Sequence, residues 1–307
     1  MRKLFIVILL LLTIFSSLST VTAHAEVNNE AKTVVAFGDS ITYGYTVDGN
    51  SYAKIYCDEK GYTLNNYAQV GMTSIQLLEL LETDLDYSRA TEILLWIGAN
   101  DLLQTVTNFA SEKGIDYNNI TYEDVKLIKS IASSSEFRTV MQSAVDSFAV
   151  NLENILNTIK QKNSGKIFVF TQYNPYSGVN IVMPSTGESL NLGLIAEEWI
   201  EKLNTVITKQ KNVEIVDTFF SIEESEEKCV NAEINVLTNT FEFDPHLNLT
   251  GHKVVYQSLL KSLAIKKEIP HNSQSNLLFV FLPIIGGISL LFVVLFVIVR
   301  IRKKLAK

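Results

Sequence analysis

The stretch Thr33-Val34-Val35-Ala36-Phe37-Gly38-Asp39-Ser40 joins a run of β-prone apolar residues to a turn sequence that ends in serine. Its first five residues predict a buried strand, and Gly-Asp-Ser predicts a turn into a helical segment. Ligands of open parallel sheets bind beyond the carboxyl ends of the strands, so the Ser40 hydroxyl is well placed to meet one. Alone this is weak evidence, because Gly-Asp-Ser also makes ordinary turns and helix caps.

Further along the chain, short apolar runs alternate with helical patterns. The runs predict four more strands, at Thr63–Tyr67, Glu92–Ile97, Lys166–Thr171 and Val213–Val216. The helical patterns fall at Tyr52–Lys60, Thr73–Leu81, Phe137–Lys162, Leu192–Gln210 and Leu249–Leu263. Such alternation indicates an α/β fold with a central, mostly parallel five-stranded sheet that helices cover on both faces.

Two longer stretches, Gln104–Glu136 and Ser221–Phe243, interrupt this alternation. Connections of this length are either lids or substrate walls, or surface insertions without a role. The sequence leaves both interpretations open.

The two ends of the chain have the patterns of export and membrane anchoring. Residues 1–25 combine a basic start, an apolar run and a small-residue site, which predicts a cleaved signal peptide. Residues 277–299 carry no charged side chain and are long enough for a transmembrane helix. Because residues 300–307 are basic, we expect a cytoplasmic C-terminus and an extracytoplasmic domain, in a single-pass protein of the cell membrane.

Between these ends, residues 26–265 suffice for one domain, and residues 266–276 form a polar tether to the membrane. The chain has 26 Lys and Arg against 33 Asp and Glu, a net charge of −7. Seven of the 26 lie in the two ends, which leaves 19 against 33, or −14, for the exposed part. This acidic balance makes nucleic acid a poor candidate partner.

The chain has only two cysteines, Cys57 and Cys229, and no Cys-x-x-Cys motif or histidine-rich cluster. We therefore expect neither a metal nor another cofactor. Export would permit one disulfide between the two cysteines, and two buried free thiols are the alternative.

Two further polar groups follow strands of the same predicted sheet. Gly71 comes after the second strand, where a glycine lets a backbone N–H approach a bound group closely. Asn100 comes after the third strand, in Gly98-Ala99-Asn100-Asp101, and can aim its side-chain amide at the same place. With the Ser40 N–H, they form a three-donor oxyanion hole, while Asp101 is expected to cap the helix that follows it.

A general base is found by elimination among four histidines. His24 leaves with the signal peptide and His271 lies in the tether, which leaves His246 and His252. His246 is preferred because Asp244 lies beside it and could orient its ring, whereas His252 falls in the first turns of the last helix.

These blocks, taken in order, resemble the SGNH hydrolases, often called GDSL esterases and lipases. Gly38-Asp39-Ser40 resembles the first block of that family, Gly71 the second, Gly98-Ala99-Asn100-Asp101 the third and Asp244-Pro245-His246 the last. The resemblance covers the whole exposed domain, and it implies a flavodoxin-like three-layer α/β/α sandwich, no metal, and ester hydrolysis through an acyl-enzyme.

The last block departs from the family pattern, because it is Asp-x-His where Asp-x-x-His is common. Pro245 favours an extended Asp244, which would point both side chains the same way. Asp244 is therefore the expected orienting carboxylate, with Glu242 and Asp217 as alternatives.

The sequence thus predicts a membrane-anchored serine esterase or lipase with Ser40 as nucleophile, His246 as base and Asp244 as orienting acid. Its substrate is expected to be a small-molecule, lipid or glycan ester. A polysaccharide O-deacetylase or acyltransferase on the same site is an alternative, and so is an inactive surface-binding protein on this scaffold.

Overall fold

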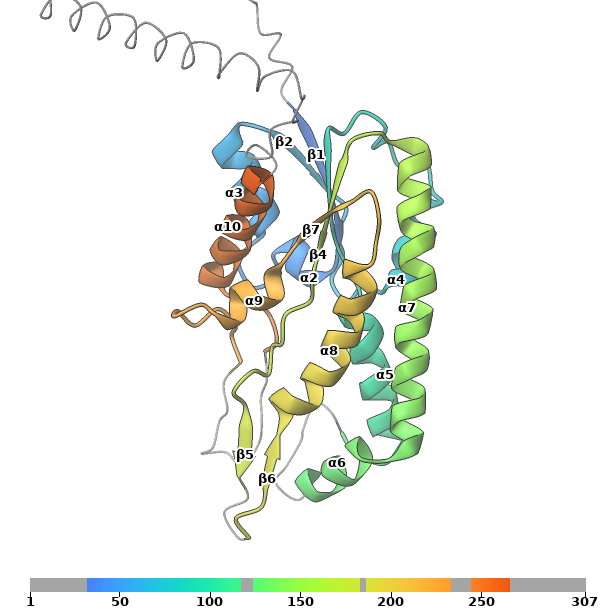
Figure 1. Cartoon of the computed structure of the whole chain (residues 1–307), viewed down its shortest axis with the longest axis vertical. Coiled ribbons are helices and arrows are strands. Elements are labelled where there is room, and N and C mark those ends of the chain that lie inside the picture. The colour runs from blue at the N-terminus through green and yellow to red at the C-terminus, as the bar shows by residue number, and fades with distance from the viewer. Residues whose placement is uncertain (1–31, 117–123, 183–185, 233–243, 266–307) are drawn as a thin grey trace, which may run out of the picture. The chain divides into compact units, whose positions relative to one another are not determined.

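The computed structural model describes residues 32–116, 124–182, 186–232 and 244–265 (Figure 1). Residues up to Leu259 form one compact unit, and residues from Leu260 onward form a second, of which only the end of the last helix is described. The expected signal peptide, tether, transmembrane helix and basic tail all lie outside the described residues.

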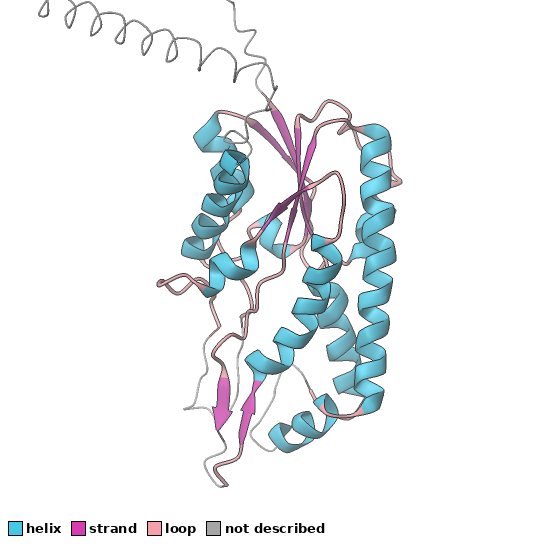
Figure 2. Ribbon diagram, viewed as in Figure 1, coloured by secondary structure: helices cyan, strands magenta, loops and turns pink. Residues whose placement is uncertain are grey.

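A five-stranded parallel sheet lies at the centre of the first unit (Figure 2). In spatial order its strands are β2 (Thr63–Asn66), β1 (Thr33–Gly38), β3 (Glu92–Trp96), β4 (Lys166–Phe170) and β7 (Glu214–Val216). All four neighbouring pairs are parallel, with Gly38 of β1 opposite Trp96 of β3. All five strands fall where the sequence predicts strands. The three central strands β1, β3 and β4 are almost entirely buried, and strands buried on both faces form largely apolar runs.

Successive residues of each strand face opposite sides of the sheet, so each face has its own helices. Val35, Ile93 and Val169 belong to the core on one face. The helices that share this core are α4 (Ser74–Leu81), α5 (Ala99–Glu112), α7 (Ser135–Lys162) and α8 (Leu192–Thr208) (Figure 1).

The other face is lined by aromatic rings and covered by α3 (Tyr52–Lys60) and by α10 (Leu249–Ile265) (Figure 1). The ring of Tyr52 lies 5.3 Å from that of Trp96 and 4.8 Å from that of Phe170, measured between centroids. With helices on both faces, the described unit is the expected three-layer α/β/α sandwich.

Four short elements have no counterpart among the residue ranges predicted for helices and strands. A four-residue helix, α2 (Ser40–Tyr43), follows β1, and α9 (Thr218–Glu223) follows β7. The strands β5 (Asn180–Val182) and β6 (Ser189–Asn191) form a separate antiparallel pair. All four are too short for apolar periodicity to define them.

The stretch Gln104–Glu136 is largely helical where it is described. It contains the end of α5, the helix α6 (Asp124–Ala132) and the start of α7. Most of the other interrupting stretch, residues 233–243, lies outside the described residues.

Cys57 and Cys229 are both buried free thiols, so they do not form the disulfide that export would permit. The Cys229 thiol donates to the backbone oxygen of Glu227 at 3.3 Å. Burial raises the pKa of the Cys57 thiol to about 12, so this group stays protonated at neutral pH.

No helix within the described part of the chain is both long enough and apolar enough to cross a membrane. The 28-residue helix α7 is long enough, but its solvent face carries charged residues such as Glu136 and Arg138. This finding corrects two expectations: a fold that includes a C-terminal transmembrane helix, and a single-pass location in the cell membrane. The stretch 277–299 on which both depended lies outside the described residues.

Candidate active site

Ser40 is the first residue of α2, directly beyond the carboxyl end of β1. Asp39 caps this short helix, because its Oδ1 accepts a hydrogen bond from the Ile41 N–H at 3.0 Å. Gly38 is required before it, since a Cβ at this position would lie 2.4 Å from both Thr42 Oγ1 and the Trp96 carbonyl oxygen. The tight turn leaves Ser40 8% exposed at the edge of the sheet.

The structure brings Ser40, His246 and Asp244 together in one chain of hydrogen bonds. His246 Nε2 lies 2.9 Å from Ser40 Oγ, and His246 Nδ1 lies 2.5 Å from Asp244 Oδ1. Asp244 Oδ1 also accepts the backbone N–H of His246 at 3.0 Å, so one carboxylate oxygen binds both the ring and the backbone. If Nδ1 carries the ring proton, Nε2 is free to accept the Ser40 hydroxyl.

The loop that carries His246 is held from three sides. The Tyr173 hydroxyl donates to the Pro245 carbonyl oxygen at 2.6 Å, and the Thr46 hydroxyl donates to the Leu247 carbonyl oxygen at 2.7 Å. The Asn231 N–H donates to the His246 carbonyl oxygen at 2.9 Å. These contacts hold the loop that carries the His246 ring beside Ser40.

Of the two alternative carboxylates, only Asp217 lies in the described part of the chain, and it has another role. Asp217 caps α9, because its Oδ1 accepts the Phe220 N–H at 3.2 Å. Glu242 lies outside the described residues.

Of the two other sequence-predicted donors, Gly71 lies on the loop after β2 and Asn100 lies in the first turn of α5. Asn100 Nδ2 donates to the Met72 carbonyl oxygen at 3.1 Å, which ties the first turn of α5 to the loop after β2. Gly71 has a φ of +77°, a conformation that favours glycine. Gly98, which precedes Asn100, has a φ of +124°, and a Cβ there would lie 2.6 Å from the Phe148 ring.

Asp101 does not cap its own helix, contrary to the expectation from the sequence. Gly98 is the residue before α5, and it makes no side-chain cap there. Asp101 instead reaches the neighbouring helix α4, where its Oδ2 accepts the Ser74 N–H at 2.9 Å and its Oδ1 accepts the Ser74 hydroxyl. The carboxylate therefore joins the N-terminal turns of two helices.

Asp39 is a buried carboxyl at the centre of the site, and the sequence analysis gave it no role. Its Oδ2 lies 3.4 Å from Asn100 Nδ2, in addition to the capping bond of its Oδ1. Burial, and to a smaller extent the charge of Asp101, raises the pKa of Asp39 to about 7. Its position inside the Gly-Asp-Ser motif is the signal that could have marked it.

Tyr173 is the second site residue that sequence reasoning missed. It lies in the segment after β4, and nothing local in the sequence indicates that its hydroxyl reaches Pro245. Burial raises its pKa well above the usual value, and nearby Asp39 and Asp244 act in the same direction, so it remains a hydrogen-bond donor at neutral pH.

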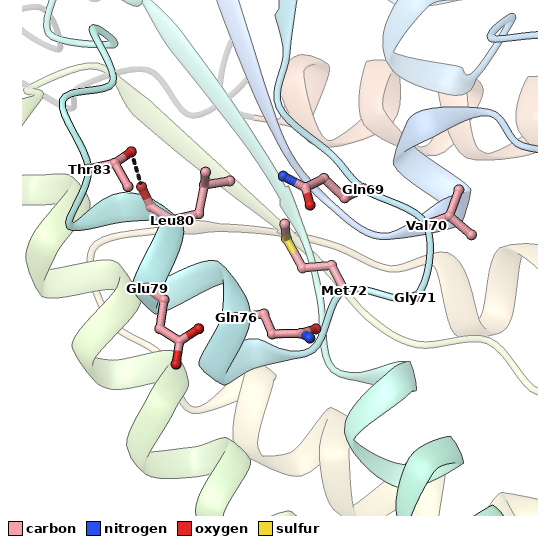
Figure 3. Close-up of a pocket in the computed structure, with 8 residues that line it drawn as sticks. All are labelled: Gln69, Val70, Gly71, Met72, Gln76, Glu79, Leu80 and Thr83. Carbon is pink, nitrogen blue, oxygen red and sulfur yellow. Dashed lines mark hydrogen bonds between the residues drawn. The ribbon is translucent and has the colours of Figure 1, made fainter.

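A pocket of about 420 Å³ adjoins the loop that carries Gly71 (Figure 3). It lies between this loop and α4, and its lining mixes polar and apolar side chains. The lining residues are Gln69, Val70, Gly71, Met72, Gln76, Glu79, Leu80 and Thr83. Within the described part of the chain, no group of three or more His, Cys, Asp or Glu side chains could hold a metal ion.

His252 lies away from the Ser40 hydroxyl, within α10. Its Nδ1 accepts the Tyr52 N–H at 3.2 Å and its side chain is 1% exposed. Burial, and to a smaller extent the charge of His246, lowers the pKa of His252 to about 4. The imidazole is therefore a neutral acceptor at neutral pH.

Protonation of His252 is expected to destabilise the protein in acid. Its pKa is 6.5 in model compounds and about 4 in the folded chain. The unfolded chain therefore binds this proton first, and stability is lost as the pH falls from 6.5 towards 4, by about 3 kcal/mol. The measurement is urea unfolding of the wild type and of His252→Gln, which keeps an acceptor but does not titrate, at several pH values.

The comparison with His252→Gln is needed because Asp39 affects stability in the opposite direction. Its pKa is higher in the folded chain, so the folded state binds its proton first and gains stability as the pH falls. The wild-type free energy of unfolding should fall relative to that of His252→Gln between pH 7.5 and pH 4. A constant difference across this range would contradict the prediction.

The sequence of this chain matches a known protein family. The model of the GDSL-like lipase/acylhydrolase family matches residues 36–254 of this chain, which include all the site residues described above. No match was found among curated proteins.

Solved structures with similar chain traces include an acetylxylan esterase from Geobacillus stearothermophilus. The two sequences are 14% identical with a TM-score of 0.47, over 75% of this chain and 93% of the other. A GDSL-like lipase from Bacteroides thetaiotaomicron is 17% identical with a TM-score of 0.43, over 78% of this chain and 89% of the other. A likeness of this size carries no conclusion about the substrate.

Proposed function

Because this chain belongs to the GDSL-like lipase/acylhydrolase family, we propose that it hydrolyses carboxylic esters through an acyl-enzyme on Ser40. The observation that carries the proposal is the chain of hydrogen bonds from Ser40 Oγ through His246 to Asp244, at 2.9 and 2.5 Å. A nucleophile within reach of a base that is itself oriented by a carboxylate is the arrangement that nucleophilic catalysis requires.

In the first half of the reaction, His246 Nε2 takes the hydroxyl proton while Ser40 Oγ attacks the ester carbonyl carbon. Asp244 keeps the other ring proton on Nδ1 and stabilises the imidazolium that forms. The imidazolium then gives its proton to the alcohol oxygen as the carbon–oxygen bond breaks, which leaves the acyl group on Ser40.

In the second half, His246 takes a proton from water, whose oxygen attacks the acyl carbon. The carboxylic acid leaves as the Ser40 oxygen regains its proton from the imidazolium. In both halves the carbonyl oxygen becomes an oxyanion, which accepts hydrogen bonds from the N–H groups of Ser40 and Gly71 and from Asn100 Nδ2.

Asn100→Ala is expected to lower kcat by about 10²- to 10³-fold, roughly 3 to 4 kcal/mol of transition-state stabilisation, with a smaller change in KM. The reason is that the amide meets a charge that exists only after attack, so its loss does not weaken binding of the neutral ester. Steady-state hydrolysis of p-nitrophenyl acetate measures both constants. An unchanged kcat would remove Asn100 from the oxyanion hole.

The experiment that tests the function is hydrolysis of p-nitrophenyl acetate together with labelling by a fluorophosphonate. A peptide map of the labelled protein should place the adduct on Ser40. Absence of both hydrolysis and labelling in a folded sample would contradict the proposal and favour a binding protein on this scaffold.

One end of the ester is proposed to lie in the pocket beside Gly71. Gly71 and Met72 line this pocket (Figure 3). The Met72 carbonyl oxygen is bound to Asn100, so the pocket adjoins two of the proposed oxyanion-hole donors. Its mixed lining suits a small or hydroxylated group better than a long acyl chain. Hydrolysis rates across p-nitrophenyl esters from acetate to dodecanoate would measure this preference.

A further inference from the structure

Two of the three donors proposed for the oxyanion hole belong to separate segments: the loop between β2 and α4, and the β3–α5 connection with the first turn of α5. The separation of these two segments, called the two loops below, must be fixed by contacts between them. Gly71 lies on the loop between β2 and α4, and Asn100 lies in the first turn of α5. A misplacement of a reacting group or donor by about 1 Å can cost about 10²-fold in rate. The side chains that join the two loops are therefore candidates for a role in catalysis.

The first contact between the loops is the bond from Asn100 Nδ2 to the Met72 carbonyl oxygen at 3.1 Å. It involves Asn100 itself, whose amide must also meet the substrate oxygen. A single hydrogen bond leaves the two loops free to pivot about it, so a second contact is needed to fix their relative orientation.

The second contact is made by Asp101, the residue after Asn100. Its two carboxylate oxygens accept the backbone N–H and the hydroxyl of Ser74, which begins α4 three residues after Gly71. Asn151 of α7 donates to the Ser74 hydroxyl at 2.9 Å, and Ser74 is fully buried. The carboxylate thus binds two atoms of one residue, in a network anchored on a third helix.

We propose that Asp101 is a positioning residue, which holds the loops of Gly71 and Asn100 so that both can donate to one oxyanion. Asp101 does not touch the substrate in this proposal, which rests on the proposed function. Because Asp101 acts by positioning Asn100 and Gly71, its substitution should lower kcat, and the size of that decrease should depend on the presence of Asn100.

A double-mutant cycle of Asp101→Ala and Asn100→Ala in the full chain tests this dependence. Alone, Asp101→Ala is expected to lower kcat for p-nitrophenyl acetate by about 10- to 100-fold with little change in KM. In the Asn100→Ala background its effect should be smaller by about threefold or more, because the donor it positions is gone. If Asp101→Ala lowered kcat by nearly the same factor in the Asn100→Ala background as in the wild type, the proposal would be overturned.

Loss of folded protein is separated from loss of positioning by two controls. Rates are expressed per active site, titrated with the fluorophosphonate. Ser134→Ala removes the cap of α7, where Ser134 Oγ accepts the Phe137 N–H at 3.2 Å, and should lower stability while leaving kcat unchanged. If Asp101→Ala likewise lowers only the melting temperature, its role is structural and the proposal fails.

Asp101→Asn keeps an acceptor oxygen for the Ser74 N–H, so it should restore kcat to within about threefold of wild type. If Asp101→Ala does not fold, Ser74→Ala replaces it in the double-mutant cycle. Ser74→Ala removes the hydrogen bond from the Ser74 hydroxyl to Asp101 and keeps the one from the Ser74 N–H. Failure of the proposed function would appear differently, as a wild-type chain that neither hydrolyses the ester nor takes the label.

Discussion

Ser40→Ala is expected to abolish ester hydrolysis, with a fall in kcat of about 10⁴- to 10⁶-fold, and to abolish fluorophosphonate labelling. The substitution removes the oxygen that would carry the acyl group. The fold should be unaffected, because Asp39 caps α2 and the Ser40 hydroxyl bonds only to His246 among the described residues. Thermal unfolding of the variant should therefore match that of the wild type.

The matched control is Ser51→Ala. Ser51 is also a buried serine at the start of a helix, but within the described residues its hydroxyl has no hydrogen-bond partner. This variant should keep both labelling and hydrolysis. If Ser40→Ala retained wild-type activity, Ser40 could not be the nucleophile.

His246→Ala is expected to lower kcat by about 10⁴- to 10⁶-fold and to slow labelling to a similar degree. Without the imidazole, Ser40 must attack as a neutral hydroxyl at neutral pH, and the leaving alcohol has no proton donor. Asp244→Asn should cost less, about 10²- to 10⁴-fold, because an amide still contacts Nδ1 but cannot stabilise the imidazolium. Kinetics with p-nitrophenyl acetate at pH 7.5 measure both effects.

His252→Gln is the histidine control for this series. His252 accepts the Tyr52 N–H, which glutamine can also do, and it has no contact with Ser40. Its kcat at pH 7.5 should equal that of the wild type. Equal losses in His246→Ala and His252→Gln would show that loss of a histidine acts through stability, and would contradict the role of His246 as base.

The sequence predicted much of the site because the relevant signals are local. Ser40, Gly71 and Asn100 each follow a predicted strand, and parallel strands end at one edge of the sheet. His246 was found by elimination, since only two of four histidines lie within the predicted domain. The short spacing from Asp244 to His246 was enough to suggest their pairing, which the structure places at 2.5 Å.

Residues that act through partners far along the chain were missed or misassigned. Tyr173 meets Pro245, 72 positions away, and Asp101 meets Ser74, 27 positions away. From the sequence alone, Asp101 is a plausible cap for its own helix, because capping residues are recognised by their place before or within a first turn. Only the tertiary structure, in which the start of α4 lies within hydrogen-bonding reach of the first turn of α5, reveals a second helix end near Asp101.

By itself, the sequence determined the five strands of the central sheet and five of the helices, the mostly parallel arrangement that brings the strand ends together, and the identity of the candidate nucleophile and base. These follow from apolar periodicity and from motif residues, which are properties of neighbouring positions in the chain. Tertiary structure alone decided how Tyr173 holds the His246 loop, that Asp39 is buried beneath Ser40, and that Asp101 joins α5 to α4. Those contacts depend on how helices and loops pack around the sheet, and packing between distant segments leaves no periodic trace in the sequence.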